Sequence, residues 1–151
     1  MDIKRISIVG MGALGILYGE FFTRKLGKEF VEFVADERRI ERYKREGVAC
    51  NGTPCDFNLV NENEKGKAAD LLIFAVKGTS LDSAIRTARN KVSKDTIILS
   101  LLNGISSEEI IGQTYGMDKM LHCVAQGMDA VKIGNELTYT QFGEICIGIM
   151  D

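Results

Sequence analysis

Short apolar runs alternate along this chain with stretches in which apolar residues recur at helical spacing. Apolar runs rich in β-branched residues predict strands, whereas recurrence at i, i+3, i+4 and i+7 predicts a helix that buries one face. The first run is followed by an apolar stripe from Leu14 to Phe22, which indicates a helix that Gly27 would end as a C-terminal cap. We expect buried strands at residues 3–9, 30–35, 71–76 and 96–102.

Charged and turn-forming residues predict the segments that connect the first strands. Residues 37–46 are charged at all but two positions, so we expect a solvated helix there. Residues 48–51 and 57–60 flank a turn that contains glycine and proline, a pattern typical of a small hairpin. The polar residues 61–67 that follow are expected to form a loop.

Two capping-box patterns mark the expected starts of later helices. Thr79-x-x-Asp82 precedes a helix expected over residues 80–88, and Ser106-x-x-Glu109 opens a second one. In this motif each side chain accepts a hydrogen bond from a backbone N–H at the start of the helix that otherwise lacks a partner. We expect Gly112 to end the second helix, because glycine is favoured just beyond a helix terminus.

The C-terminal third predicts strands without intervening helices. Residues 120–124 form a further apolar run, and residues 137–140 and 144–149 alternate as an antiparallel pair that closes the domain. The near-continuous apolar strands nearer the N-terminus, separated by helices, indicate a parallel sheet covered on both faces. The expected fold is therefore α/β: a doubly wound, mostly parallel sheet with antiparallel strands at its C-terminal edge.

Composition limits the classes of protein to which this domain can belong. With 151 residues, 45% hydrophobic and 26% charged, the chain matches a single globular domain. A net charge of −2 argues against a nucleic-acid partner, which would require a basic face. No apolar run approaches the roughly 20 residues that span a bilayer, and glycines interrupt the N-terminal apolar stretch. We expect a cytoplasmic domain that binds neither nucleic acid nor membrane.

The cysteines give no indication of a metal site. Cys50, Cys55, Cys123 and Cys146 form no C-x-x-C pair, and together with the single His122 they show no zinc-binding spacing. We expect buried or half-buried free thiols in a reducing compartment and no bound metal.

A glycine-rich turn carries the strongest functional signal. It fits G-x-G-x-x-G and lies between an expected strand and an expected helix, the context in which this motif binds a dinucleotide. The first glycine allows the tight turn, the second lets the backbone approach a pyrophosphate, and the third lets helix and strand pack closely. The sequence therefore predicts a Rossmann-type dinucleotide site, with a glycine turn of an unrelated α/β protein as the less favoured interpretation. The motif residues are Gly10, Met11, Gly12, Ala13, Leu14 and Gly15.

The end of the second strand leaves the choice of cofactor open. Asp36 follows Gly15 by about 20 residues, the spacing of the carboxylate that binds the ribose 2′-hydroxyl of NAD. Arg38 and Arg39 come directly after it, and a guanidinium suits the 2′-phosphate of NADP. The two arginines are equally compatible with the solvated face of the helix at 37–46.

Four segments together resemble the ketopantoate (2-dehydropantoate) reductase family. They are IVGMGALGILYG, FAVKGTSLDSAI, LSLLNGISSEEIIG and GNELTYTQFGEICIG, and they extend over essentially the whole chain. The resemblance implies that residues 1–151 are the NADP-binding domain of an NADPH-dependent 2-dehydropantoate 2-reductase. Such an oxidoreductase reduces a small 2-keto acid, ketopantoate, to pantoate for pantothenate and coenzyme A biosynthesis.

The resemblance also implies roles for particular residues. Gly10 to Gly15 would hold the pyrophosphate, and Lys77 would lie beside the cofactor. Asn103 would bind both nicotinamide and substrate, and the backbone of Ala130 would touch the nicotinamide end. Many family members have an arginine where this chain has Asp36, so we expect Arg38 or Arg39 to bind the 2′-phosphate, with NAD(H) as the alternative cofactor.

The family's proton-donating lysine belongs to a second, helical domain, which also holds the keto acid. The resemblance therefore implies that residues 1–151 carry no catalytic residue and are inactive alone. A non-catalytic NAD(P)-binding module or redox sensor of the same fold is the alternative, and a scaffold without nucleotide is a third. The sequence predicts no oligomeric state.

Overall fold

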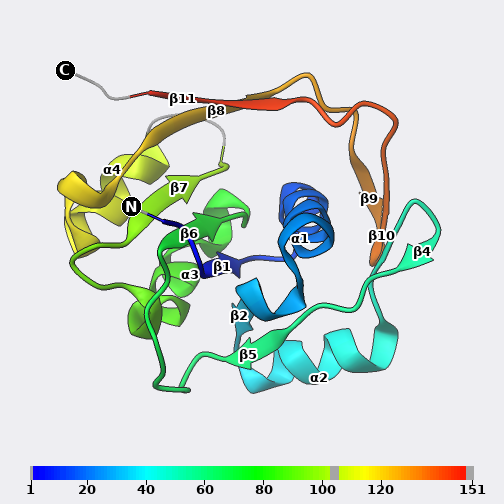
Figure 1. The fold of residues 1–151 in the computed structure, drawn as a ribbon, viewed down its shortest axis with the longest axis horizontal. Coiled ribbons are helices and arrows are strands. Elements are labelled where there is room, and N and C mark those ends of the chain that lie inside the picture. Colours follow the sequence, from blue (N-terminus) through cyan, green and yellow to red (C-terminus); the bar gives the residue numbers. More distant parts are fainter. Residues whose placement is uncertain (1, 103–105, 149–151) are drawn as a thin grey trace.

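A computed structural model describes residues 2–102 and 106–148. Its centre is a five-stranded, wholly parallel sheet in the order β5-β2-β1-β6-β7 (Figure 1). The strands are β1 (Ile6–Val9), β2 (Val31–Ala35), β5 (Leu59–Asn61), β6 (Leu71–Phe74) and β7 (Ile97–Ser100). The predicted doubly wound α/β fold is thus confirmed, because the strand order reverses direction on either side of β1.

Helices cover both faces of this sheet and divide the core into two clusters. On one face, α1 (Ala13–Leu26) and α2 (Glu37–Glu46) pack over inward residues such as Ile8 and Phe33. On the other face, α3 (Leu81–Thr87) and α4 (Ser106–Tyr115) pack over Leu72 and Phe74. Alternate residues of each strand belong to opposite clusters, as a two-fold strand period requires. Short 3₁₀ segments, numbered η1 to η4, occupy Lys28–Phe30, Gly78–Ser80, Arg89–Lys91 and Met117–Lys119.

The remaining strands form two small sheets beside the main one. The strands β4 (Thr53–Pro54), β3 (Ala49–Cys50), β10 (Glu136–Thr138) and β9 (Val131–Ile133) form one sheet in that order. The second is the antiparallel pair of β8 (His122–Gln126) and β11 (Glu144–Gly148). Figure 1 shows β8 and β11 running together along one end of the molecule, with β9 and β10 turning down beside α1. Both β10 and β3 contact α1, so this layer covers the helix from outside.

Three of the expected strand arrangements are wrong in detail. β3 pairs with β4, whereas β5 joins the main sheet beside β2, so residues 48–51 and 57–60 do not form a hairpin with each other. Part of the loop expected over 61–67 also belongs to β5, which includes Asn61. The closing strands are antiparallel but not mutual partners, because β10 pairs with β9 and β11 pairs with β8. The alternation of apolar residues shows which face of a strand is buried, but packing against distant segments decides which strand it pairs with.

Helix boundaries also differ from the sequence-based expectations. The helix expected to end at Gly112 continues to Tyr115, and Gly116, with φ of 109°, follows it. The Thr79–Asp82 capping box does not form, because η2 occupies residues 78–80 and α3 begins at Leu81 without a side-chain cap. The strand expected at 120–124 begins two residues later, at His122. Among the described residues no helix combines the length and apolar character needed to cross a membrane.

Candidate functional site

A cavity of about 470 Å³ lies at the carboxyl ends of β1, β2 and β6. Its wall includes the turn from Gly10 to Leu14, the end of β2 at Ala35, and Lys77 beyond β6. Volumes of roughly 300–1,000 Å³ are usual for small-molecule sites. Open α/β sheets bind ligands outside the carboxyl ends of their strands, which is where this cavity lies.

The glycine-rich turn is shaped by close contact with the end of β6. A Cβ atom on Gly10, whose φ is +112°, would lie 2.4 Å from the carbonyl oxygen of Ala75. One on Gly12 would lie 3.0 Å from the same oxygen, and one on Gly15 would lie 2.3 Å from the oxygen of Gly10. Because Gly10 and Gly12 have no room for a side chain, their backbone atoms themselves form this part of the cavity wall.

The turn presents the start of α1 to the cavity. The helix begins at Ala13, and its N-cap residue Gly12 has no side chain that could accept the first amide hydrogens. Unpaired N–H groups and the positive end of the helix dipole favour an anion at such a position. The turn thus fits a phosphate group in both shape and charge.

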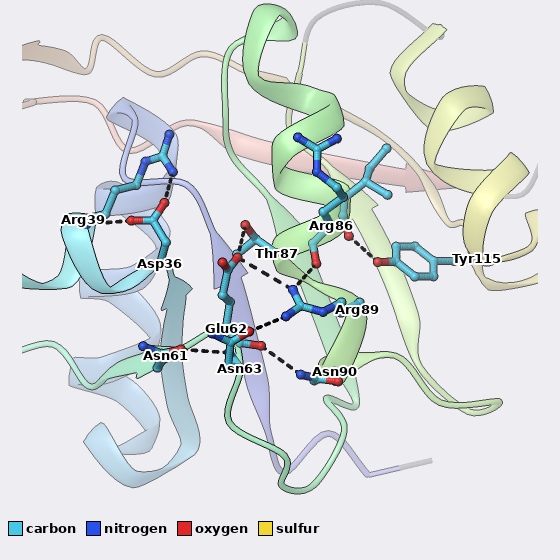
Figure 2. A network of polar contacts seen from close by, with 11 residues as sticks. Asp36, Arg39, Asn61, Glu62, Asn63, Arg86, Thr87, Arg89, Asn90 and Tyr115 are labelled. Atoms are coloured by element: carbon cyan, nitrogen blue, oxygen red, sulfur yellow. Dashed lines mark hydrogen bonds and ion pairs between the residues drawn. The ribbon is translucent and has the colours of Figure 1, made fainter.

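Asp36 has a structural partner on its own helix. It is the N-cap of α2 and accepts a hydrogen bond of 2.8 Å from the backbone N–H of Arg39. Its second carboxylate oxygen contacts the Arg39 guanidinium, as Figure 2 shows. The carboxylate is therefore engaged on both oxygens by Arg39.

The structure separates the two candidate arginines. Arg39 lines the cavity, whereas the side chain of Arg38 is exposed and is absent from the cavity wall. Arg39 and Tyr43 lie one helical turn apart on α2, so they share the face directed at the cavity. Of these two arginines, only Arg39 lines the cavity.

The far wall of the cavity comes from η2 and α3. Ser80, Ser83 and Thr87 line it, and Thr87 donates a hydrogen bond of 2.8 Å to the Glu62 carboxylate. Figure 2 shows Glu62 and its neighbours joined to Arg89 and Asn90 by further polar contacts. This network fixes the segment after β5 against α3 and so holds one side of the cavity.

The other predicted site residues differ in their placement. Lys77 is the N-cap residue of η2, is exposed and lines the cavity, and its predicted contact with the cofactor stays a prediction. Ala130 packs half-buried against the core between β8 and β9 and does not belong to the cavity wall. Asn103 lies outside the described residues, so its predicted contact with nicotinamide and substrate stays a prediction.

Lys132 is a cavity residue that the sequence reasoning missed. Its Nζ donates a hydrogen bond of 2.7 Å to the carbonyl oxygen of Met11, 121 residues away in the chain. Burial lowers the pKa of this lysine, and the nearby charges of Arg42 and Lys77 lower it further. The available signal was its place in Val131-Lys132-Ile133, where strand alternation directs the lysine away from two apolar neighbours.

The four cysteines are free thiols; Cys50 is buried and Cys55 and Cys123 are half-buried, as expected, but Cys146 is exposed, which corrects the prediction for that residue. Burial, followed by the charge of Glu108, raises the pKa of Cys123 to about 11. Glu108 itself is buried and contacts Nδ1 of His122. Within the part of the chain that the structure describes, no three histidine, cysteine or acidic side chains are grouped as metal ligands.

Residues 6–151 match the family described as ketopantoate reductase PanE/ApbA. The chain belongs to this family. The 2-dehydropantoate 2-reductase of Pyrococcus horikoshii is 34% identical over 114 residues, which cover 74% of this chain and 37% of that protein. The family resemblance inferred from the four sequence segments is therefore confirmed.

Solved structures agree with this assignment of the fold. The 2-dehydropantoate 2-reductase of Geobacter metallireducens superposes with a TM-score of 0.77 at 26% identity, covering 95% of this chain and 48% of that one. A D-mandelate dehydrogenase determined with NADH and anilino(oxo)acetate has a TM-score of 0.76 at 24% identity, covering 95% and 47%. The chain thus spans between about a third and a half of the relatives it matches.

Proposed function

We propose that residues 1–151 form the cofactor-binding half of an NADP(H)-dependent reductase of the 2-dehydropantoate 2-reductase type. The observation that carries this proposal is the cavity at the carboxyl ends of β1, β2 and β6, lined by the glycine turn. Family membership supports the reaction class, since the relatives are named 2-dehydropantoate 2-reductases. The product, pantoate, would serve pantothenate synthesis in the cytoplasm.

The residues of this chain would hold and orient the dinucleotide. The amides at the start of α1 would bind the pyrophosphate, and the nicotinamide would lie toward Lys77. Contact of Asn103 with the nicotinamide is what the family resemblance implies. When bound, the nicotinamide supplies the hydride that reduces a keto carbonyl. Reduction also needs a proton donor within hydrogen-bond reach of the carbonyl oxygen. We expect the family's second domain to supply it.

NADP(H) is the proposed cofactor because of how Asp36 and Arg39 pair. The Asp36 carboxylate is oriented by the backbone amide and the guanidinium of Arg39, so its position is set by the start of α2. The guanidinium beside it remains partly exposed to the cavity and can turn toward a phosphate. NAD(H), which the spacing of Asp36 alone would favour, is the cofactor against which this proposal is tested.

Binding titrations with the two arginine variants test the proposal. Arg39→Met should weaken NADPH binding about tenfold or more, since a charge-assisted contact contributes about 1.5–3 kcal/mol. NADH binding should hold or improve, because Asp36 is released. Arg38→Met is the matched control and should change neither affinity more than about twofold. If the wild-type protein binds NADH more tightly than NADPH, the proposed choice of NADP(H) is wrong. If it binds neither dinucleotide, the proposed function itself is wrong.

A further inference from the structure

Strand β9 shows an inverted pattern of exposure. Its two apolar residues, Val131 and Ile133, are 56% and 78% exposed, whereas the lysine between them is directed inward. Lys132 pairs in register with Leu137 of β10, whose side chain is fully buried. A strand normally buries its apolar residues and exposes its charged ones. The arrangement in β9 is the reverse and is unfavourable by itself, because turning a charged side chain away from water costs free energy.

The inward lysine is held against the glycine turn. Its Nζ donates to the Met11 carbonyl at 2.7 Å, which uses one of the three N–H groups of an ammonium. The side chain also lines the cavity, so the remaining N–H groups lie at a space large enough for a ligand. This single hydrogen bond fixes the position of the charge without neutralising it.

The surroundings of Lys132 are cationic. Burial is the main cause that lowers the pKa of Lys132, and the positive charges of Arg42 and Lys77 lower this pKa further. Arg39, one turn before Tyr43 on the inner face of α2, lines the same cavity. Arg39 already pairs with the Asp36 carboxylate, whereas Lys77 and Lys132 pair with no carboxylate among the described residues. Like charges at one cavity repel one another unless an anion binds among them. The missing partner is therefore expected to be strongly anionic.

We propose that Lys132 binds the 2′-phosphate of the dinucleotide and thereby helps select NADP(H) over NAD(H). The inference rests on the proposed dinucleotide site and adds a residue to it from a distant strand. Of the two cations near Lys132, Lys77 follows β6, whereas Arg42 belongs to α2, as does Arg39 on the cavity wall. Because α2 lies beyond the end of β2, where the adenosine ribose of a dinucleotide binds, the 2′-phosphate is favoured over the bridging pyrophosphate. The pyrophosphate already has the amides of α1.

Titrating NADPH and NADH against position-132 variants tests this inference. Lys132→Met should weaken NADPH binding about tenfold or more and change NADH binding less than about twofold. Lys132→Arg should retain most of the preference for NADPH, because it keeps the charge. Lys25→Met, an exposed lysine at the opposite end of α1, is the matched control and should leave both affinities unchanged.

A second variant and probe separate phosphate binding from support of the turn. Lys132→Gln can still donate to a carbonyl but carries no charge, and adenosine 2′,5′-bisphosphate carries the 2′-phosphate without the pyrophosphate bridge. We expect Lys132→Gln to remove the wild-type preference for this probe over ADP. Equal losses for NADPH and NADH, or no loss for either, would overturn the role of Lys132 alone. Wild type that binds neither dinucleotide would overturn the proposed function as well.

Discussion

The carboxylate of Asp36 makes two contacts with the same residue of α2. As the N-cap of α2 it accepts the Arg39 amide hydrogen, a contact that contributes roughly 0.5–2 kcal/mol to helix stability. The same carboxylate contacts the guanidinium of Arg39, a residue that lines the cavity. A substitution here would therefore change both the start of the helix and the arginine that faces the cavity, so Arg39 is the cleaner position for a binding test.

Thiol reactivity should follow the environment of each cysteine. A thiol with the pKa of about 11 found for Cys123 is ionised to about one part in a thousand at pH 8, and the thiolate is the reactive form. Cys146 is exposed on β11. We expect iodoacetamide to alkylate Cys146 well before Cys123 in the folded protein, as peptide mass spectrometry would show.

The pH dependence of this alkylation has a definite sign. The Cys123 rate should rise about tenfold per pH unit between pH 7 and 10, because deprotonation is incomplete throughout that range. Cys55, whose pKa burial also raises to about 11, should behave in the same way. In urea all four thiols should react alike. Equal rates for Cys123 and Cys146 in the folded protein would contradict this assignment.

At the scale of elements, β2 carries a buried charge at its amino end. Glu32 is 3% exposed, and its carboxylate lies 3.2 Å from Arg5 and 3.0 Å from Lys91 of η3. The contact with Lys91 is an ion pair by distance, without a well-aligned hydrogen bond to Oε2. Both members of this pair are buried, so each depends on the other for its charge.

Removing Lys91 should destabilise the fold. Lys91→Met leaves the Glu32 carboxylate buried with Arg5 alone, and breaking a buried pair typically costs about 3–5 kcal/mol of unfolding free energy. Urea denaturation would measure the loss. The double variant Glu32→Gln with Lys91→Met should recover much of it, because no uncompensated charge remains.

Cofactor affinity provides the control for this stability test. Glu32 lies about 13 Å along β2 from Asp36, at the strand end opposite the cavity. Lys91→Met should therefore leave NADPH affinity unchanged at a temperature where the variant is folded. A fall in affinity without loss of stability would show that the pair acts on the cavity instead.

At the scale of the whole molecule, we expect residues 1–151 to bind NADPH without efficient reduction of 2-dehydropantoate. The cations on the described cavity wall are Arg39, Lys77 and Lys132, and Arg39 and Lys132 are assigned above to phosphate. Reactants held in alignment reach effective molarities of roughly 10⁵–10⁸ M. Without the second domain to hold the keto acid against the nicotinamide, we expect most of this rate advantage to be lost. Turnover should be at least about a thousandfold below that of a full-length relative.

NADPH consumption at 340 nm measures this difference, with the Pyrococcus horikoshii enzyme as the positive control. Comparable rates for the two proteins would contradict the idea that the proton donor lies elsewhere. Lys77 would then be the first residue to substitute, because it faces the cavity and is exposed. Binding without turnover in any longer form of the protein would instead favour a non-catalytic dinucleotide-binding module.

The sequence by itself determined the parallel sheet, its helices and the glycine turn. These features depend on local patterns: apolar runs that form β1, β2, β6 and β7, and a G-x-G-x-x-G motif between strand and helix. Each pattern depends on the periodicity of a single backbone segment, so it can be recognised without knowing which other segments pack against it. The sequence did not determine which of Arg38 and Arg39 faces the cavity, because both follow Asp36 in the same charged helix.

Only the tertiary structure decided which segments pair and which side chains meet. The alternation in residues 57–60 and 144–149 indicated strands, yet their partners are β2 and β8. Lys132 came to the glycine turn because β9 pairs with β10 and β10 with β3 beside α1. An alternating pattern specifies which face of a strand is buried and leaves the partner to long-range packing, so a contact 121 residues apart had no local signature.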